Sequence, residues 1–162
     1  MKTLEDLFEH QLKDLYSAET QLIDMLPILV HEANDKKLKK AFEDHLEETK
    51  NQQKRLEEIC EELHISPDGE TCKAMEGLIN ETKSFIEKVS DDDLMDVGLI
   101  AEAQRIEHYE ISGYGTAVRY AKELEHRKIA EKLQSTLDEE YDADNKMDKM
   151  AENRLNRKAI EK

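Results

Sequence analysis

The 162-residue sequence is poor in the residues that interrupt helices. It contains 5 glycines, 2 prolines and no tryptophan, and aromatic residues make up only 5% of the chain. Few helix breakers combined with many Glu, Lys, Leu and Ala residues are typical of long helices. A chain of this length buries a sizeable core as one domain. We therefore expect a single all-α domain over residues 1–162.

Cysteine and long apolar runs are also scarce. Cys60 and Cys72 are the two cysteines, and they do not form a C-x-x-C pair, so we interpret them as reduced thiols. No segment approaches the roughly 18 apolar residues that a membrane-spanning helix needs. The N-terminal stretch MKTLEDLFEH carries acids where a signal peptide has an apolar run. These features predict a cytoplasmic protein with no membrane partner.

Positively charged residues are fewer than negatively charged ones. The chain has 24 Lys and Arg residues against 39 Asp and Glu residues, which gives a formal net charge of −15. Such a chain would be repelled by a nucleic acid and by an anionic membrane surface, so we expect neither as a partner. The acidic balance is compatible with cation binding, although most charge of this kind is solvated helix surface.

Apolar residues recur with helical periodicity in five stretches. The expected helices cover residues 3–31, 38–63, 73–88, 94–124, and from about 129 toward the C-terminus. The segment HISPDGE at 64–70 is a clear stop signal, and Ser90 or a neighbouring Asp is expected to cap the helix that follows. Short turns at 33–37 and 125–128 join the long helices into two antiparallel hairpins.

The connection between the two hairpins is long and includes the short helix at 73–88. A four-helix bundle with one long crossover is the ferritin-like arrangement, and this is the fold that we predict. A solenoid or an extended coiled coil fits less well, because neither a 34-residue repeat nor a sustained heptad pattern is present.

Each long helix interrupts its apolar face with polar residues near mid-length. Glu110 lies in the centre of a stripe made by Leu99, Ala103, Ile106, Gly113 and Ala117. Glu107 lies at the edge of the same stripe, in the helix expected at 94–124. The helix at 3–31 is interrupted by Glu19, and the helix from about 129 by Glu140 and Asp144. In the helix at 38–63 the interruptions are His45, Thr49 and Gln52, with Glu48 at the edge.

Four of these glutamates are expected at one level of the bundle. In an antiparallel hairpin, residues equally distant from the turn lie side by side. Glu19 and Glu48 are about equally distant from the turn at 33–37, and Glu110 and Glu140 from the turn at 125–128. An uncompensated buried carboxylate costs several kcal/mol. Four at one level therefore indicate that positive charge lies among them.

Two interpretations remain open for this layer. In one, the acids pair with Lys and Arg, and Thr49, Gln52 and tyrosines complete a polar network inside a helical interaction module. In the other, two metal ions offset the four carboxylates, and ligands of this type suit iron or manganese, with zinc as a further candidate. The candidate ligands are Glu19, His45, Glu48, Gln52, Glu107, Glu110, Glu140 and Asp144.

The Glu-x-x-His motif of di-iron bundles is absent from the expected positions. Its two literal matches, at 61–64 and 123–126, lie at helix ends roughly 20 Å from the carboxylate layer. Three residues after Glu48 and Glu140 the chain has Asn51 and Ala143 instead of histidine. His108 lies on the opposite side of its helix from Glu110.

Five segments resemble a known family, the YciE/YciF-type ferritin-like proteins of bacteria. They are DLYSAETQL (14–22), AFEDHLEETKNQ (41–52), CKAMEGLI (72–79), IEHYEISGYGT (106–116) and LDEEYDAD (137–144). The resemblance implies a four-helix ferritin-like core with extra helices, a dimetal site, a homodimer and a link to bacterial stress responses. It assigns Glu19, Glu48, Glu107, Glu110 and Glu140 as ligand candidates, and it implies no particular reaction.

Two functions are compatible with these features. The first is an oxidoreductase of the ferroxidase or peroxidase type, in which protected redox metal reacts with oxygen or peroxide. The second is a metal-binding or structural stress protein without turnover, since few proton-transfer groups accompany the layer. A storage cage is less favoured, because nothing in the sequence predicts assembly of 12 or 24 subunits.

Overall fold

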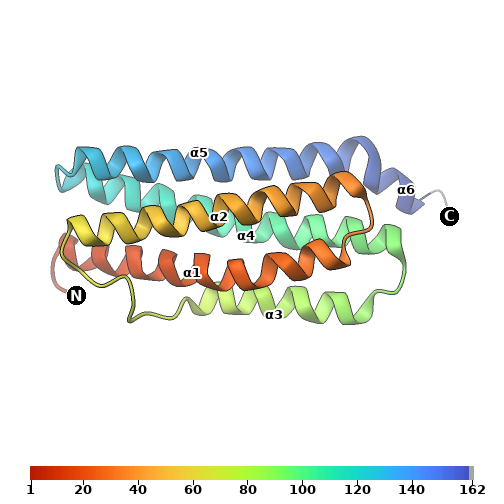
Figure 1. Cartoon of the computed structure of the whole chain (residues 1–162), viewed down its shortest axis with the longest axis horizontal. Helices are drawn as coiled ribbons and strands as arrows, with labels where there is room; N and C mark the ends of the chain where they lie inside the picture. The colour runs from red at the N-terminus through yellow and green to blue at the C-terminus, as the bar shows by residue number, and fades with distance from the viewer. Residues whose placement is uncertain (161–162) are drawn as a thin grey trace.

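A computed structural model describes residues 1–160, and every regular element among them is helical (Figure 1). The protein is therefore all-α, as predicted. The elements are α1 (Leu4–Glu32), α2 (Lys36–Glu62), α3 (Lys73–Lys88), α4 (Asp92–Glu123), α5 (Arg127–Met150), a π-helical turn (Ala151–Leu155) and α6 (Asn156–Ile160). The last helix, expected from about residue 129 toward the C-terminus, corresponds to α5 followed by the π-helical turn and α6. Residues 161–162 lie outside the described part.

Four helices start at side chains that accept backbone N–H groups. Thr3 forms a capping box with Asp6 at the start of α1, and Asp35, Cys72 and Asp91 cap α2, α3 and α4. α2, α4 and α5 each begin two residues before the start predicted from apolar periodicity, because the first two residues of each helix are charged. The cap of α4 is Asp91, one of the acids proposed for that role.

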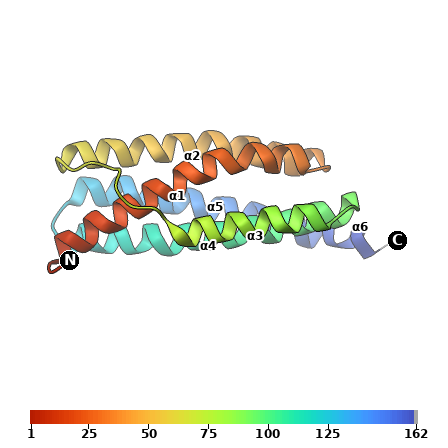
Figure 2. The same ribbon diagram turned by 90° about the horizontal axis from the view of Figure 1, so that it is seen from below.

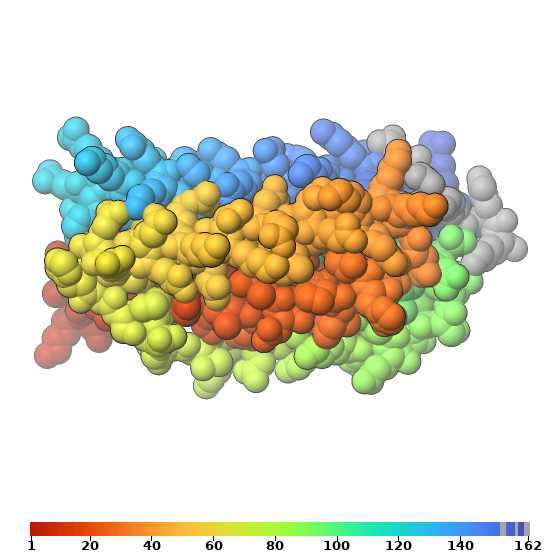
Figure 3. All heavy atoms as spheres, in the orientation of Figure 1, coloured from red at the N-terminus to blue at the C-terminus, as the bar shows by residue number. Residues whose placement is uncertain are grey.

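The long helices run side by side as two hairpins. α1 packs against α2, and α4 against α5, while α1 also packs on α4 and α2 on α5 (Figures 1 and 2). α3 lies along α1 and α4. In the space-filling view, α2 covers the middle of the visible face between α5 and α1 (Figure 3). No helix within residues 1–160 combines the length and apolar character needed to cross a lipid bilayer.

The apolar core is divided in two along the helix axes. One cluster includes Leu26, Phe42 and Leu99, near the α1–α2 turn. The other includes Leu12, Leu56, Tyr114 and Leu133, toward the α4–α5 turn. Glu19, Gln52, Glu110 and Glu140, one on each long helix, are buried between members of the two clusters. The fold therefore encloses a polar layer between two apolar ends.

Candidate metal centre

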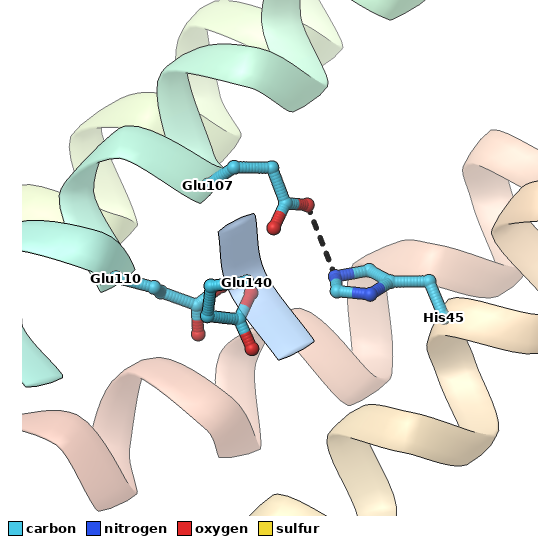
Figure 4. A group of neighbouring side chains, drawn as sticks. All are labelled: His45, Glu107, Glu110 and Glu140. Carbon is cyan, nitrogen blue, oxygen red and sulfur yellow. Dashed lines mark ion pairs between the residues drawn. The ribbon is translucent and has the colours of Figure 1, made fainter. Parts of the chain in front are cut away.

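Four buried side chains converge in the polar layer. His45 of α2, Glu107 and Glu110 of α4 and Glu140 of α5 each offer a ligand atom, and these atoms all lie within 4.8 Å of one another (Figure 4). Ligands that share one ion at about 2.1 Å are separated by at most about 4.2 Å. A small movement of these four side chains toward one another would therefore let them coordinate a cation.

Glu19 enters the same layer from α1. It is fully buried, and one of its carboxylate oxygens accepts a hydrogen bond from the hydroxyl of Tyr114 on α4. Its second oxygen has no partner among the described residues. Burial raises the pKa of Glu110 well above its usual range, and the charge of Glu19 adds to this rise. Glu19 therefore belongs to the electrostatic environment of the cluster.

His45 supplies the imidazole of the site. Its Nε2 lies 3.0 Å from Glu107 Oε1, and its Nδ1 lies 3.7 Å from Glu48 Oε2. Burial alone would lower the pKa of His45, but the charge of Glu107 raises it well above its usual range. Burial would raise the pKa of Glu107, and the charge of His45 outweighs this and lowers it. The two groups thus stabilise each other as an ion pair.

Several carboxylate oxygens in the layer have no hydrogen-bond partner among the side chains that the structure describes. Both oxygens of Glu110 are in this state, as is one oxygen each of Glu19, Glu107 and Glu140. Burial raises the pKa of Glu19 to about 8 and that of Glu140 well above its usual range. Unpaired buried carboxylates are costly, and a divalent cation removes that cost. Hard oxygen ligands with one imidazole fit iron, manganese or zinc.

The remaining candidate ligands lie around this group. The Glu48 side chain is 38% exposed and reaches the layer only through His45. Gln52 is buried, and its amide nitrogen donates to Glu140. Asp144 does not join the cluster, because its carboxylate contacts Gln104 Nε2 at 3.0 Å and His108 Nε2 at 3.2 Å at the seam between α4 and α5.

The two Glu-x-x-His matches lie at helix ends, as expected. Glu61 and Glu123 occupy the last turns of α2 and α4, and His64 follows α2 with a positive φ of 57°. His126 precedes α5 and stacks on Phe8, with ring centroids 6.3 Å apart. The cluster of four ligand-type side chains does not include any of these residues.

The sequence did not reveal three residues that support the layer. Tyr114 donates a hydrogen bond to Glu19. Arg55 and Glu139 form an ion pair beside Gln52, with Arg55 Nη1 3.0 Å from Glu139 Oε2. The spacing in the sequence could have indicated two of them. Tyr114 follows Glu110 by four residues, so the two lie on the same side of α4, and Arg55 follows Gln52 by three, so these two lie on the same side of α2.

Comparisons with known proteins agree with this architecture. The family described as "Domain of unknown function (DUF892)" matches residues 3–160. Protein YciF of Escherichia coli (strain K12) is 44% identical over 163 residues, covering 100% of this chain and 98% of YciF. The crystal structure of the E. coli stress protein YciF matches with a TM-score of 0.92, covering 96% of this chain and 99% of that chain.

Two further solved structures match most of the chain. YcfI from Rhodopseudomonas palustris is 38% identical with a TM-score of 0.89, covering 91% of this chain and 94% of that chain. A protein from Xanthomonas campestris pv. campestris is 18% identical with a TM-score of 0.75, covering 93% and 92%, and shows a shared fold alone. By its family match and its similarity to YciF, this chain belongs to the DUF892 family.

Proposed function

We propose that this protein is a ferritin-like dimetal protein of the bacterial stress response. In this proposal α1, α2, α4 and α5 form the four-helix bundle, and two metal ions, most suitably iron, occupy its polar layer. Two divalent cations would offset the carboxylates of Glu19, Glu107, Glu110 and Glu140. The description of YciF as a stress protein supports the link to stress.

Glu110 carries the proposal. It is 0% exposed, and both of its oxygens lack a hydrogen-bond partner in the described part of the chain. Glu19, Glu107 and Glu140 each have one oxygen engaged by Tyr114, His45 or Gln52. Glu110 has no such contact, so a cation is the simplest group that would stabilise a carboxylate there.

The protein's own side chains would hold and orient the metal ligands. Tyr114 fixes Glu19, and Gln52 fixes Glu140, each through one oxygen, which leaves the other oxygen free for a cation. The two apolar clusters on either side exclude bulk water. Iron bound in such a site supplies one-electron chemistry toward oxygen or peroxide. An oxidoreductase of the ferroxidase or peroxidase type is the activity that follows.

The first test is metal content. Protein purified without chelator, and again after anaerobic loading with ferrous iron, should contain about two irons per chain by mass spectrometry. Glu110→Gln should lose most of this metal. Glu102→Gln is the matched control, because Glu102 is a buried carboxylate of the same helix that contacts Arg105 outside the cluster. Equal metal in Glu110→Gln and wild type would contradict the site.

A metal-binding or structural stress protein without turnover is the second candidate. Three of the four carboxylates already have one protein partner each, so the layer has the features of a polar network that persists without metal. Oxygen and peroxide consumption by iron-loaded protein separates the two functions. Stoichiometric iron without consumption would favour the second candidate, and no metal under either condition would leave only the structural role.

The assembly is a further part of the proposal. The family resemblance implies a homodimer, and the sequence features predict that it lies in the cytoplasm. The 18.9-kDa chain would then sediment at twice that mass. Analytical ultracentrifugation over a range of protein concentrations tests this directly. A species at the mass of one chain at all concentrations would contradict the dimer, and a species of 12 or 24 chains would favour a cage.

A further inference from the structure

A chain of polar contacts leads from α2 to the buried carboxylate of Glu140. Its outer member is Arg55, whose side chain is 23% exposed. Arg55 Nη1 and Nη2 donate to the two oxygens of Glu139 at 3.0 and 3.1 Å, and Nη1 also donates to the hydroxyl of Thr136. A guanidinium that engages a carboxylate with two parallel hydrogen bonds fixes both groups in one orientation.

Gln52 connects this ion pair to the layer. The nitrogen of its buried amide donates to Glu139 Oε2 at 3.1 Å and to Oε1 of Glu140. The reverse orientation of the amide would turn its oxygen toward two carboxylates, which repel it. Both protons of the amide nitrogen are therefore used, one on each carboxylate. As a result, Glu140 has one oxygen engaged, while its Oε2 has no partner within the described chain.

We infer that Arg55 is a positioning residue that acts through Glu139 and Gln52 to present Oε2 of Glu140 to the metal. The inference rests on the proposed function, because it takes Glu140 as a ligand. It goes beyond that function by assigning a role to Arg55 and Glu139, which touch no candidate ion, and by assigning one oxygen of Glu140 as the ligand atom.

The positive charge of Arg55 also offsets the negative charge of Glu139 next to the polar layer. Glu139 and Glu140 are adjacent in sequence, and both accept from the same amide. Without a cation on Glu139, its carboxylate would be free to turn and take the Gln52 amide with it. Groups that orient metal ligands in this way typically change metal affinity by 10- to 100-fold when they are removed.

Metal affinity is the first measurement. Arg55→Met should weaken the binding of manganese or ferrous ion, titrated under anaerobic conditions, by about 10- to 100-fold. Arg55→Lys should fall between this variant and wild type, because an ammonium cannot form the two parallel bonds. Lys132→Met is the matched control: Lys132 of α5 pairs with Glu58 at 3.4 Å and with Glu62, joining the same two helices away from the cluster. Equal loss in both Met variants would overturn the inference.

A double-mutant cycle tests whether the effect passes through Gln52. In a Gln52→Leu background, Arg55→Met should cause no further loss of affinity, because the connection is already broken. Full additivity of the two losses would show that Arg55 acts by another route and would overturn the inference. Thermal unfolding of the metal-free variants identifies any loss that arises from general destabilisation.

A readout without metal separates this inference from the proposed function. In metal-free protein, the side-chain amide of Gln52 gives its own ¹⁵N–¹H signals, which report its two hydrogen bonds. Arg55→Met should shift these signals and speed their hydrogen exchange, whereas Lys132→Met should not. Unchanged Gln52 signals would overturn the inference even if wild type binds metal. Changed signals in a protein that binds no metal would support the positioning step and contradict the dimetal site.

Discussion

His45 and Glu107 form a buried ion pair across the interior, with Nε2 and Oε1 3.0 Å apart. Their side chains are only 5% and 2% exposed. α2 packs mainly on α1 and α5, so this pair connects two helices that do not run side by side. Removing one member of a buried pair leaves an uncompensated charge, and the layer already contains three other carboxylates. The pair therefore contributes both to the stability of the metal-free protein and to the proposed site.

The first prediction concerns His45. In metal-free protein at pH 7, His45→Ala should lower the free energy of unfolding by about 3 kcal/mol, because Glu107 loses its buried partner. Chemical denaturation in the presence of a chelator measures this. His108→Ala is the control, since the His108 side chain is 68% exposed and contacts Asp144 at the surface, and its effect should stay within about 0.5 kcal/mol. Similar losses in both variants would contradict a special role for the ion pair.

The second prediction concerns pH. Burial raises the pKa of Glu19 from 4.5 to about 8, so between these values the folded protein holds a proton that the unfolded chain has released. The stability of the metal-free protein should therefore fall as pH rises from 5 to 8, by about 1.4 kcal/mol per pH unit for this group. The raised pKa of His45 acts in the same direction.

Denaturation at several pH values, with chelator present, tests this slope. Glu19→Gln should make the slope shallower, because the substituted amide does not titrate. Bound divalent metal should also flatten the slope, since a cation replaces the protons of the carboxylates. Stability that rises between pH 5 and 8 in metal-free protein would contradict the assignment of Glu19 as a carboxyl group that is protonated in the fold.

Much of the fold and part of the site could be predicted from the sequence. The helices follow from apolar periodicity, and the inward direction of Glu19, Glu110 and Glu140 follows from their place within apolar stripes, which is a property of one helix at a time. The structure brings these three glutamates into the layer. Their distances from the turns predicted that they lie at one level of the bundle. A short turn leaves two antiparallel helices little freedom to slide past each other along their axes.

Apolar periodicity could not predict the contacts of residues at the edge of an apolar helix face. Asp144 lies one turn after Glu140, yet it contacts Gln104 and His108 because α5 meets α4 along that seam. Glu48 is at the edge of the apolar face of α2, where a small rotation decides between the interior and solvent, and its side chain is 38% exposed. His45, which its spacing places within that face, is buried as expected. These outcomes depend on the relative rotation of neighbouring helices, which one helix's sequence does not encode.

The third prediction concerns the contact between α3 and α4. A Cβ added at Gly98 would come within 1.8 Å of Phe85 Cζ, so Gly98→Ala should displace the ring and destabilise the protein by about 1–2 kcal/mol. Gly77→Ala is the control, because no atom lies within 4 Å of its added Cβ, and it should stabilise α3 by about 0.5–1 kcal/mol. Thermal unfolding measures both. Phe85→Leu should restore part of the loss, and stabilisation by Gly98→Ala would contradict the close packing.

The last prediction concerns the turn between α1 and α2, which α4 holds through a buried carboxylate. Asp96 Oδ1 accepts the backbone N–H of Asn34 at 2.7 Å, and Oδ2 accepts that of Asp35 at 2.8 Å. Hydrogen bonds to a charged group contribute about 1.5–3 kcal/mol. Asp96→Ala should therefore destabilise the protein by about 2–3 kcal/mol, and Asp96→Asn by less, because its amide keeps one accepting oxygen.

Hydrogen exchange locates this effect in the turn. The amides of Asn34 and Asp35 should exchange faster in Asp96→Ala, while those in the middle of α2 should change only as much as global stability requires. Asp24→Ala serves as the control, since Asp24 is an exposed residue of α1. If exchange at the turn is unchanged while the whole protein loses stability, the carboxylate does not hold the turn. Faster exchange there would show that the α1–α2 hairpin depends on a contact 61 residues away in sequence.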